Sequence, residues 1–223
     1  MARGRIALSS RLRHRYGCRT HSRLVGCAQQ QRHPLGAHRL VRRVAAGLAP
    51  GIALSEGLAP VLGVRPWLLI LGSLPGAASL AAQQYYAHPR NLFWPLMGHL
   101  FAAGPALPYA QRLQALGRAG VALWDVLHSA SRRGSLDADI DARSATANDL
   151  SALLSAQPQI CCVAFNGKSA ATLFQRHGRT QWAGHTRRLT QLTLPSTSPA
   201  HAALSAADKL QQWQQLLALR PKT

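Results

Sequence analysis

Residues suited to binding and chemistry gather in three short loops of this 223-residue chain, each placed directly after an apolar run. Residues 72–76 have the sequence GSLPG, residues 166–169 have NGKS, and residues 195–199 have PSTSP. Two glycines and a proline within five residues force a tight turn and let a ligand approach the backbone closely. Amide and hydroxyl side chains both donate and accept hydrogen bonds. We therefore expect a site that recognises its ligand by hydrogen bonding.

Several other kinds of site are disfavoured. None of these loops has the P-loop pattern, and no G-x-G-x-x-G follows a strand, so nucleotide-cofactor chemistry is not expected. The G-x-S-x-G elbow of α/β-hydrolases is also missing from the sequence. The four cysteines, Cys18, Cys27, Cys161 and Cys162, include no C-x-x-C pair, and the last two lie in an apolar run typical of a core. The sequence thus predicts no cofactor, no metal and no disulfide.

Asn91 is a further candidate, and the sequence alone leaves its role open. It follows a His88-Pro89 break and precedes the apolar segment 92–101, which is expected to be a helix. An asparagine at a helix start commonly accepts a hydrogen bond from a free backbone amide. Capping is therefore the simplest role for Asn91, and a catalytic role does not exclude it.

The elements that position these loops alternate along the chain. Strands are expected at residues 67–71, 121–127, 160–165 and 189–194, and residues 131–145 are expected to be a polar surface excursion. Helices are expected at 79–85 with Ser79 as cap, and at 92–101, 108–117, 149–154, 169–177 and 202–220, the last with Leu210, Trp213, Leu216 and Leu217 toward the core. This alternation predicts an α/β fold in three layers, α/β/α, around a central, mainly parallel four-stranded sheet. Ligands bind beyond the carboxyl ends of such strands, so the three loops should line one crevice.

Basic and acidic residues are distributed unevenly along the chain. The formal net charge is +19, which favours a polyanionic partner. Residues 1–50 contain 11 arginines and no acidic residue, and the rest of the chain carries a net charge of +8. We therefore expect a basic, disordered extension over residues 1–55 and a folded domain over residues 56–223.

The extension has three possible origins. Its composition resembles a transit peptide, it fits a nucleic-acid-binding tail, and it fits upstream sequence translated from a start codon assigned too early. We favour the last, because the segment shows no hydrophobic period that would support folding. No compact apolar stretch follows the first arginines, which argues against a secretory signal, and no apolar segment reaches the ~18 residues of a membrane span.

The motifs resemble a known family. Residues 72–76, Gln84-Tyr85-Tyr86, His88-Pro89-Arg90-Asn91 and Phe93-Trp94 are similar, in order and spacing, to the signature of the DNA-deoxyinosine (hypoxanthine-DNA) glycosylase branch of the uracil-DNA glycosylase superfamily. Residues 165–168 and 194–199 agree with it, so the resemblance runs from about residue 58 to the C-terminus. It implies a monofunctional DNA glycosylase that hydrolyses the N-glycosidic bond of deaminated bases, chiefly hypoxanthine, in base excision repair. It also implies a monomer, acting on DNA in the cytoplasm of a bacterium.

The resemblance assigns roles in a base pocket formed by Gly72, Ser73, Leu74, Pro75, Gly76, Tyr86, Phe93 and Asn166. Many relatives carry a catalytic Asp or Asn at the position of Leu74, and a catalytic histidine at the position of Leu194. Both are replaced here, so the resemblance implies that Asn91 orients the attacking water and that uracil is a poor substrate. Gly76 stands where uracil-specific relatives carry a bulky tyrosine, which leaves room for a purine.

The remaining pocket residues have ordinary structural roles as alternatives. Asn166 is placed to read the edge of the base, although Asn-Gly is also a common turn. Tyr86 and Phe93 are candidates for stacking on the base, although aromatic residues at this spacing are more often part of a core.

The DNA-binding residues implied by the resemblance are His88, Arg90, Lys168, Pro195, Ser196, Thr197, Ser198 and His201, with Arg187 and Arg188 as further phosphate contacts. Residues 195–199 resemble the loop that relatives insert into DNA, and Ala200 and His201 would probe the gap left by the flipped base. Lys168 has the chemistry for a Schiff base with the opened sugar. Its place beside a strand–helix turn favours phosphate binding, so no lyase activity is expected.

Other functions remain open at this stage. One is a non-catalytic nucleic-acid-binding protein, or one of altered specificity, on the same fold. Another is a mismatch uracil/thymine-type DNA glycosylase. Hydrolysis of a free nucleoside would use a similar pocket. Release of hypoxanthine from DNA distinguishes a deoxyinosine glycosylase from these alternatives.

Overall fold

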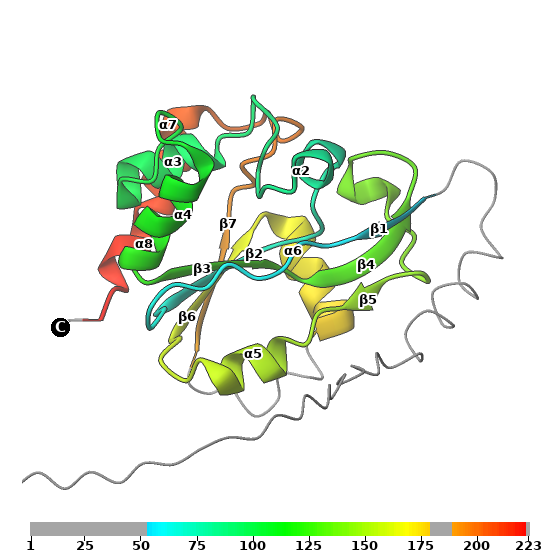
Figure 1. Ribbon diagram of the computed structural model, residues 1–223. Coiled ribbons are helices and arrows are strands. Elements are labelled where there is room, and N and C mark those ends of the chain that lie inside the picture. The colour runs from blue at the N-terminus through cyan, green and yellow to red at the C-terminus, as the bar shows by residue number, and fades with distance from the viewer. Residues whose placement is uncertain (1–52, 179–188, 222–223) are drawn as a thin grey trace, which may run out of the picture.

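The structure, a computed structural model, describes residues 53–178 and 189–221 (Figure 1). Its strands are β1 (Ala53–Glu56), β2 (Leu68–Gly72), β3 (Val121–Asp125), β4 (Leu127–Arg132), β5 (Thr146–Ala147), β6 (Cys162–Asn166) and β7 (Thr190–Leu194). Its helices are α2 (Ala77–Ala82), α3 (Phe93–Phe101), α4 (Tyr109–Arg118), α5 (Leu150–Ala156), α6 (Lys168–Leu173), α7 (Ala206–Trp213) and α8 (Gln215–Ala218). A 3-10 turn, η1 (Asp137–Asp139), and a π-helical turn, η2 (Phe174–Gly178), complete the set.

Four parallel strands form the central sheet, in the order β3-β2-β6-β7. Leu68 of β2 pairs with Val121 on one side and with Cys162 on the other, so β2 lies between two neighbours. The chain leaves β2 toward β3 and later leaves β6 toward β7, in opposite directions along the sheet. This confirms the predicted fold class, and it places a topological switch point between β2 and β6, where open sheets bind ligands.

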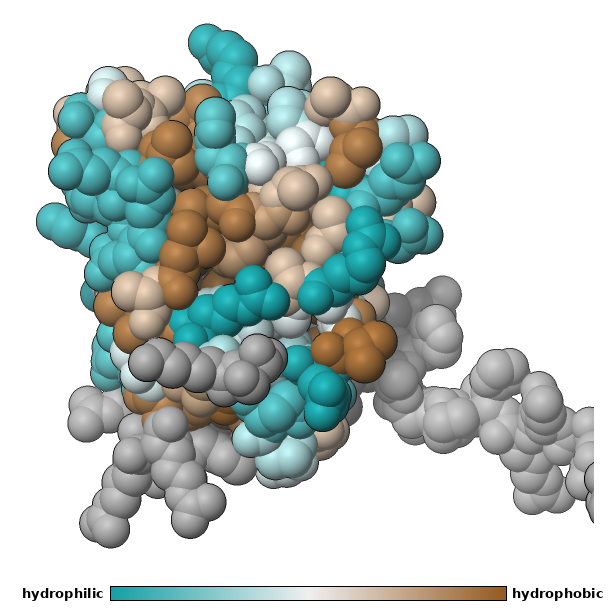
Figure 2. Space-filling view, turned by 90° about the vertical axis from the view of Figure 1, so that its left-hand side faces the viewer, coloured by the Kyte–Doolittle hydropathy of each residue, from teal (hydrophilic) through white to brown (hydrophobic). Residues whose placement is uncertain are grey.

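Both faces of the sheet are covered, which explains why β2 is apolar at every position. Side chains alternate between faces along a strand. Leu68 and Ile70 accordingly pack with α3, α4, α7 and α8, whereas Leu69 and Leu71 pack with α5, α6 and β4. On the outer side of the helical layer formed by α3, α4, α7 and α8, hydrophilic residues border a strip of hydrophobic ones (Figure 2). The three layers hold the strand ends rigidly beneath the loops of interest.

Some helix boundaries differ from the sequence prediction. Ser79 is not a helix cap: α2 begins at Ala77, and the Ser79 hydroxyl lies inside the helix, where it accepts a hydrogen bond from the Ala87 N–H at 3.2 Å. The predicted last helix is divided into α7 and α8, and α7 begins only after Ser205, whose side chain forms a capping box with Asp208. Leu217 is exposed rather than part of the core, while Trp213 and Leu216 are fully buried.

A second, antiparallel sheet was not expected. It has the order β1-β4-β5, and β4 runs through residues that the sequence assigned partly to a surface excursion. Ser131 and Arg132 are buried in this strand, so the excursion begins only at residue 133. β1 pairs with β4 from Ala53 to Glu56, so strand pairing begins before the expected domain start at residue 56.

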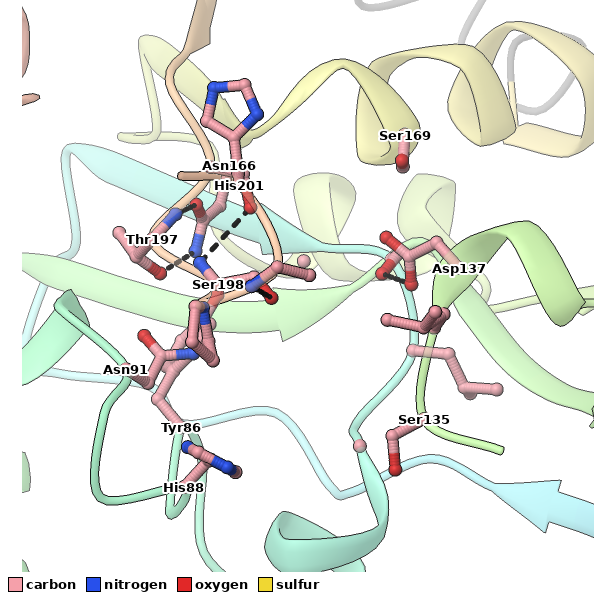
Figure 3. A pocket seen from close by; sticks show the side chains of 18 of the residues that line it. Tyr86, His88, Asn91, Ser135, Asp137, Asn166, Ser169, Thr197, Ser198 and His201 are labelled. Atoms are coloured by element: carbon pink, nitrogen blue, oxygen red, sulfur yellow. Dashed lines mark hydrogen bonds between the residues drawn. The ribbon is translucent and has the colours of Figure 1, made fainter. Parts of the chain in front are cut away.

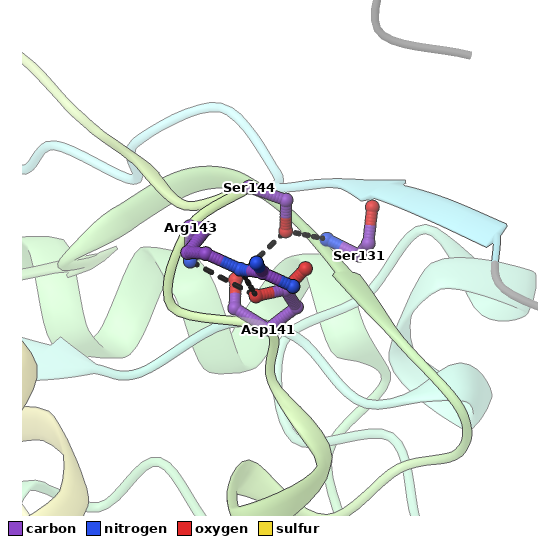
Figure 4. A network of polar contacts seen from close by, with 4 residues as sticks. All are labelled: Ser131, Asp141, Arg143 and Ser144. Atoms are coloured by element: carbon purple, nitrogen blue, oxygen red, sulfur yellow. Dashed lines mark hydrogen bonds and ion pairs between the residues drawn. The ribbon is translucent and has the colours of Figure 1, made fainter. Parts of the chain in front are cut away.

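The excursion returns to the strand it left through a compact polar network (Figure 4). The Ser144 hydroxyl donates to the Asp141 carbonyl and accepts from the Ser131 N–H, both at 2.8 Å. The Asp141 N–H donates to the Ser131 carbonyl, also at 2.8 Å. The exposed ion pair between Arg143 and Asp141 (3.6 Å) adds little by itself. These bonds fix the base of the segment 133–143.

Some expectations concern residues outside the described part of the chain. The basic extension lies there up to residue 52, as do Cys18, Cys27, Arg187 and Arg188. Among the described residues, Cys162 is buried in the core as predicted, and Cys161 is half-buried. No helix in the described ranges is long and apolar enough to cross a membrane.

Candidate functional site

A cavity of about 990 Å³ opens at the carboxyl end of the central sheet. The loops after β2, β6 and β7 line it, together with the last residue of β3 and part of the segment 133–143. Asn91, Asn166 and Thr197 lie on one side of the hollow, and Ser135 and Asp137 lie on the other (Figure 3). The three loops therefore share one crevice, as the strand pattern predicted.

The structure brings together every predicted site residue of the described ranges except Phe93, while Arg187 and Arg188 lie outside those ranges. The cavity is lined by Gly72, Ser73, Leu74, Pro75, Gly76, Tyr86, His88, Arg90, Asn91, Asn166, Lys168, Pro195, Ser196, Thr197, Ser198 and His201. Their placement is a structural fact, whereas their individual roles remain predictions.

Phe93 belongs to the core and does not reach the cavity. Its side chain is fully buried, and it meets Trp94 and Trp213 edge to face. Its ring stacks on Tyr86, with centroids 3.8 Å apart. The sequence therefore identified an aromatic pair correctly, but only Tyr86 is placed to contact a base. Phe93 supports the Tyr86 ring from behind.

The Asn91 side chain bonds an amide at the start of α3, where Leu92 holds the N-cap position, and Asn91 also lines the cavity. Its Oδ1 accepts a hydrogen bond from the Phe93 N–H at 2.9 Å, which satisfies one free amide of the helix start. The neighbouring Leu92 N–H donates to the Thr197 carbonyl at 3.0 Å, so this loop is tied to the loop after β7. Within the described residues the Asn91 amide nitrogen has no hydrogen bond. That nitrogen and the second lone pair of Oδ1 can therefore hold a water or a substrate group.

Asn166 is held in one orientation by Thr197. Its Nδ2 donates to Thr197 Oγ1, and its Oδ1 accepts from the Thr197 N–H, both at 2.9 Å. Thr197 is fully buried, which makes this pair rigid. Gly167 lets the chain turn directly afterwards, since its φ of +101° suits glycine and a Cβ there would lie 2.8 Å from Ser196 Cβ. One proton and one lone pair of the Asn166 amide remain for a ligand.

The GSLPG loop provides space rather than catalytic groups. Leu74 is buried and packs in the core beneath the loop, so its side chain offers no polar group to the cavity. A Cβ placed on Gly76 would meet only Ser135 Cβ, at 4.0 Å. The surroundings of Gly76 are thus open, as expected for a site that admits a large base.

The loop after β7 is fixed from below by α7. The Trp213 indole N–H donates to the Pro195 carbonyl at 3.0 Å, and Lys209 Nζ donates to the His201 carbonyl at 2.7 Å. Lys209 is buried, and burial lowers the pKa of its amine. The two contacts hold both ends of residues 195–201, and Ser196 and Ser198 line the cavity between them.

Two carboxylates at this cavity escaped the sequence prediction, Asp125 and Asp137. Asp137 accepts a hydrogen bond from the Ser73 hydroxyl at 2.6 Å, which joins the excursion to the GSLPG loop. The buried Arg132 guanidinium donates to the Pro75 carbonyl in the same loop. Asp137 could not be found from periodicity, because it lies in an irregular segment. Asp125 was missed because it lies inside the predicted strand 121–127, whereas β3 ends at Asp125 and so brings it to the cavity.

Asp125 is the more unusual of the two, because it is 3% exposed and its Oδ2 has no hydrogen bond within the described residues. Burial, helped by the charge of Asp137 and opposed by that of Arg132, raises its pKa to about 7. The neighbouring Tyr86 hydroxyl is also buried; it makes no hydrogen bond of full geometry within the described residues, although the Asn166 side chain is close enough to interact with it. Burial and the charge of Asp125 raise the pKa of Tyr86, so this hydroxyl keeps its proton at neutral pH.

Comparison with known proteins connects this site to one family. Residues 60–218 match the family model of the uracil DNA glycosylase superfamily. The chain is 39% identical over 116 residues to a hypoxanthine DNA glycosylase of Methanosarcina barkeri, covering 52% of this chain and 72% of the relative. It is 37% identical over 118 residues to the protein of the same name from Methanosarcina acetivorans, covering 52% and 73%.

A solved structure agrees with the sequence matches. It is the solution NMR structure of a Methanosarcina acetivorans protein assigned provisionally to the uracil DNA glycosylases. The two folds superimpose with a TM-score of 0.60 and 30% sequence identity, over 74% of this chain and 99% of the other. The match therefore covers almost the whole of that protein and most of the described part of this one.

Proposed function

The chain belongs to the uracil DNA glycosylase superfamily, and from this premise we propose that it is a monofunctional DNA glycosylase that excises deaminated bases, chiefly hypoxanthine from deoxyinosine. The observation that carries the proposal is the convergence of the three motif loops on one cavity. The relatives named hypoxanthine DNA glycosylase support the choice of base.

Such an enzyme must take the target nucleotide out of the base stack and hold it in a pocket. The cavity is built for this task, because Tyr86 offers a ring for stacking and the fixed Asn166 amide offers a donor and an acceptor for the base edge. The open space around Gly76 accommodates a purine. Basic residues Arg90 and Lys168 at the rim suit the flanking phosphates.

Hydrolysis then requires a positioned water more than a strong base, since the departing base leaves a sugar that resembles an oxocarbenium cation. Asn91 cannot take a proton at neutral pH, but its amide can orient water. Its hydrogen bond to the Phe93 N–H fixes the amide in place. Leu74 and Leu194 supply no polar group, so Asn91 is the residue to which we assign water orientation, and efficient excision of uracil is not expected.

The test is the release of hypoxanthine from an oligonucleotide containing deoxyinosine. The protein should release the free base and leave an abasic site that breaks only on treatment with alkali. Strand breaks that appear without alkali, in step with base release, would contradict the monofunctional assignment. Binding without any release at enzyme excess would favour a non-catalytic DNA-binding protein instead.

Two further parts of the proposal concern the molecule in the cell. We propose that it acts as a monomer and that it works on DNA in the cytoplasm. The first part is checked by sedimentation of the protein with and without DNA. The second is checked by locating a tagged, full-length chain in its host.

A further inference from the structure

Two polar atoms at the floor of the cavity have no hydrogen-bond partner within the described residues, Asp125 Oδ2 and the Tyr86 hydroxyl oxygen. Both groups approach the same face of Gly72. A Cβ added there would clash with Asp125 Oδ1 and would lie 3.3 Å from the Tyr86 hydroxyl. A buried polar atom without a partner destabilises the folded state. Both residues line the cavity, so a polar ligand group that reaches these atoms would remove that cost.

Burial first, and the neighbouring charges second, decide in which protonation state Asp125 faces the ligand. Asp137 raises its pKa and Arg132 lowers it, while Tyr85 and Tyr86 beside it are both neutral because their own pKa values are raised. Burial is the largest of these effects and raises the pKa of Asp125 to about 7, so about half of the Asp125 carboxyl groups carry a proton at that pH and most do below it.

The proposed reaction needs a proton at this place. When the C1′–N9 bond of deoxyinosine breaks, both electrons of the bond go to the base, and protonation of the purine ring stabilises the negative charge that develops. Leu74 and Leu194 cannot provide that proton. Asp125 is the most deeply buried carboxyl group that lines the cavity in the described structure.

Resting on the proposed function, we propose that Asp125 is a catalytic acid of this site, which faces the flipped purine and passes a proton to its N7 as the C1′–N9 bond breaks. The base leaves as neutral hypoxanthine that carries the new proton on N7. The water held by Asn91 forms the new bond to C1′ and releases one proton to solvent. Asp125, left ionised, regains a proton from solvent before the next turnover.

The experiment measures single-turnover base release from two duplexes, one with deoxyinosine and one with 7-deaza-2′-deoxyinosine, which lacks N7. The wild-type rate on deoxyinosine should fall as the pH rises through about 7 and should be at least ~10²-fold higher than on the 7-deaza substrate. Asp125→Asn should lose a similar factor and the pH dependence on deoxyinosine, but should change the 7-deaza rate by less than about 3-fold. Asp141→Asn, a matched change in the excursion, should leave both rates unchanged.

Each outcome is informative. An equal loss for Asp125→Asn on both substrates, or unchanged rates on both, overturns the inference while leaving the glycosylase function intact. A wild-type pH profile that is the same on both substrates overturns it as well, and this needs no variant. Failure of the wild-type protein to release hypoxanthine at all would instead remove the proposed function on which the inference rests.

Discussion

At the scale of single residues, Asn91 combines helix capping with the role proposed for it in hydrolysis. The change Asn91→Ser separates these roles, because serine caps a helix about as well as asparagine but is too short to hold a water in the same place. We expect the free energy of unfolding of Asn91→Ser to lie within about 0.5 kcal/mol of the wild-type value. We expect the variant to release hypoxanthine at least ~10²-fold more slowly. Thermal melting and single-turnover excision measure the two quantities.

A matched control exists at the start of α5, where Asp149 Oδ1 accepts from the Ala152 N–H at 2.8 Å. Asp149 lies away from the cavity, so Asp149→Ser should preserve both the cap and the excision rate. Near-wild-type excision by Asn91→Ser would leave Asn91 as a cap only. The water would then have to be held elsewhere, with Asn166 as the next candidate.

We propose that Gly76 decides which bases fit, and this role can be tested without disturbing the backbone. Its φ of −71° is open to any residue, and a Cβ would meet only Ser135 at 4.0 Å. Gly76→Ala should therefore be nearly silent, whereas the ring of Gly76→Tyr should enter the cavity and lower hypoxanthine release by roughly 10-fold or more. Competitive inhibition by free hypoxanthine, compared for the two variants, reports the loss of space directly. Equal inhibition of both variants would show that Gly76 does not border the base.

The residues of the site were predictable to the extent that strand ends and loop motifs expose them. Asn91, Gly76 and Asn166 lie in such loops, and all three reach the cavity. Phe93 was assigned to the pocket wrongly, because sequence spacing cannot show which of two stacked rings faces outward. Asp137 was missed because its place depends on a hydrogen bond from Ser73, a residue 64 positions earlier.

At the scale of secondary-structure elements, the central sheet was predictable and the second sheet was not. β2 is apolar throughout because it is covered on both faces, and that pattern is visible in the sequence. β4 contains two buried serines that are placed by contacts across the sheet. The Ser129 hydroxyl shares a hydrogen bond with Thr146 at 2.7 Å, and the Ser131 backbone N–H donates to Ser144, while the Ser131 hydroxyl has no partner within the described residues. Such pairing is set by tertiary contacts, so hydropathy alone indicates a surface loop.

β1 shows where the folded unit begins, and its removal gives a prediction at this scale. A chain that starts at residue 51 retains β1, whereas one that starts at Gly57 loses its four pairs with β4. We expect the chain that starts at residue 51 to match the full-length protein in stability. The chain that starts at Gly57 should have a free energy of unfolding lower by at least about 2 kcal/mol, since each backbone hydrogen bond contributes ~1 kcal/mol. Denaturant titration compares them.

The same shortened chains test the basic extension. The chain that starts at residue 51 lacks all 11 arginines of residues 1–50 and should bind DNA with a shallower dependence on salt than the full-length protein. Its rate of hypoxanthine release at enzyme excess should be unchanged. A loss of excision in this chain at full stability would show that the extension belongs to the active enzyme.

At the scale of the whole molecule, the buried acid of the cavity should make stability depend on pH. The pKa of Asp125 is raised from 3.8 to about 7 in the folded protein, mainly by burial. The folded state therefore disfavours the ionised form. The stability that a protonated Asp125 allows is fully present below pH 3.8 and is lost as the pH rises through about 7.

Asp125→Asn removes this titration and keeps a side chain of nearly the same size. The difference in free energy of unfolding between the variant and the wild type therefore isolates the contribution of Asp125 ionisation. The variant should gain in relative stability between pH 4.5 and pH 8, by roughly 2–3 kcal/mol at about 1.4 kcal/mol per unit of pKa shift. Denaturant unfolding of both proteins at the two pH values gives the quantity, and the other titrating groups cancel because both proteins share them. A difference that stays constant with pH would mean that Asp125 ionises freely in the folded protein. It would then be a surface-like carboxylate unable to keep a proton near neutral pH, and the acid proposed for the departing base would have to be sought elsewhere in the cavity.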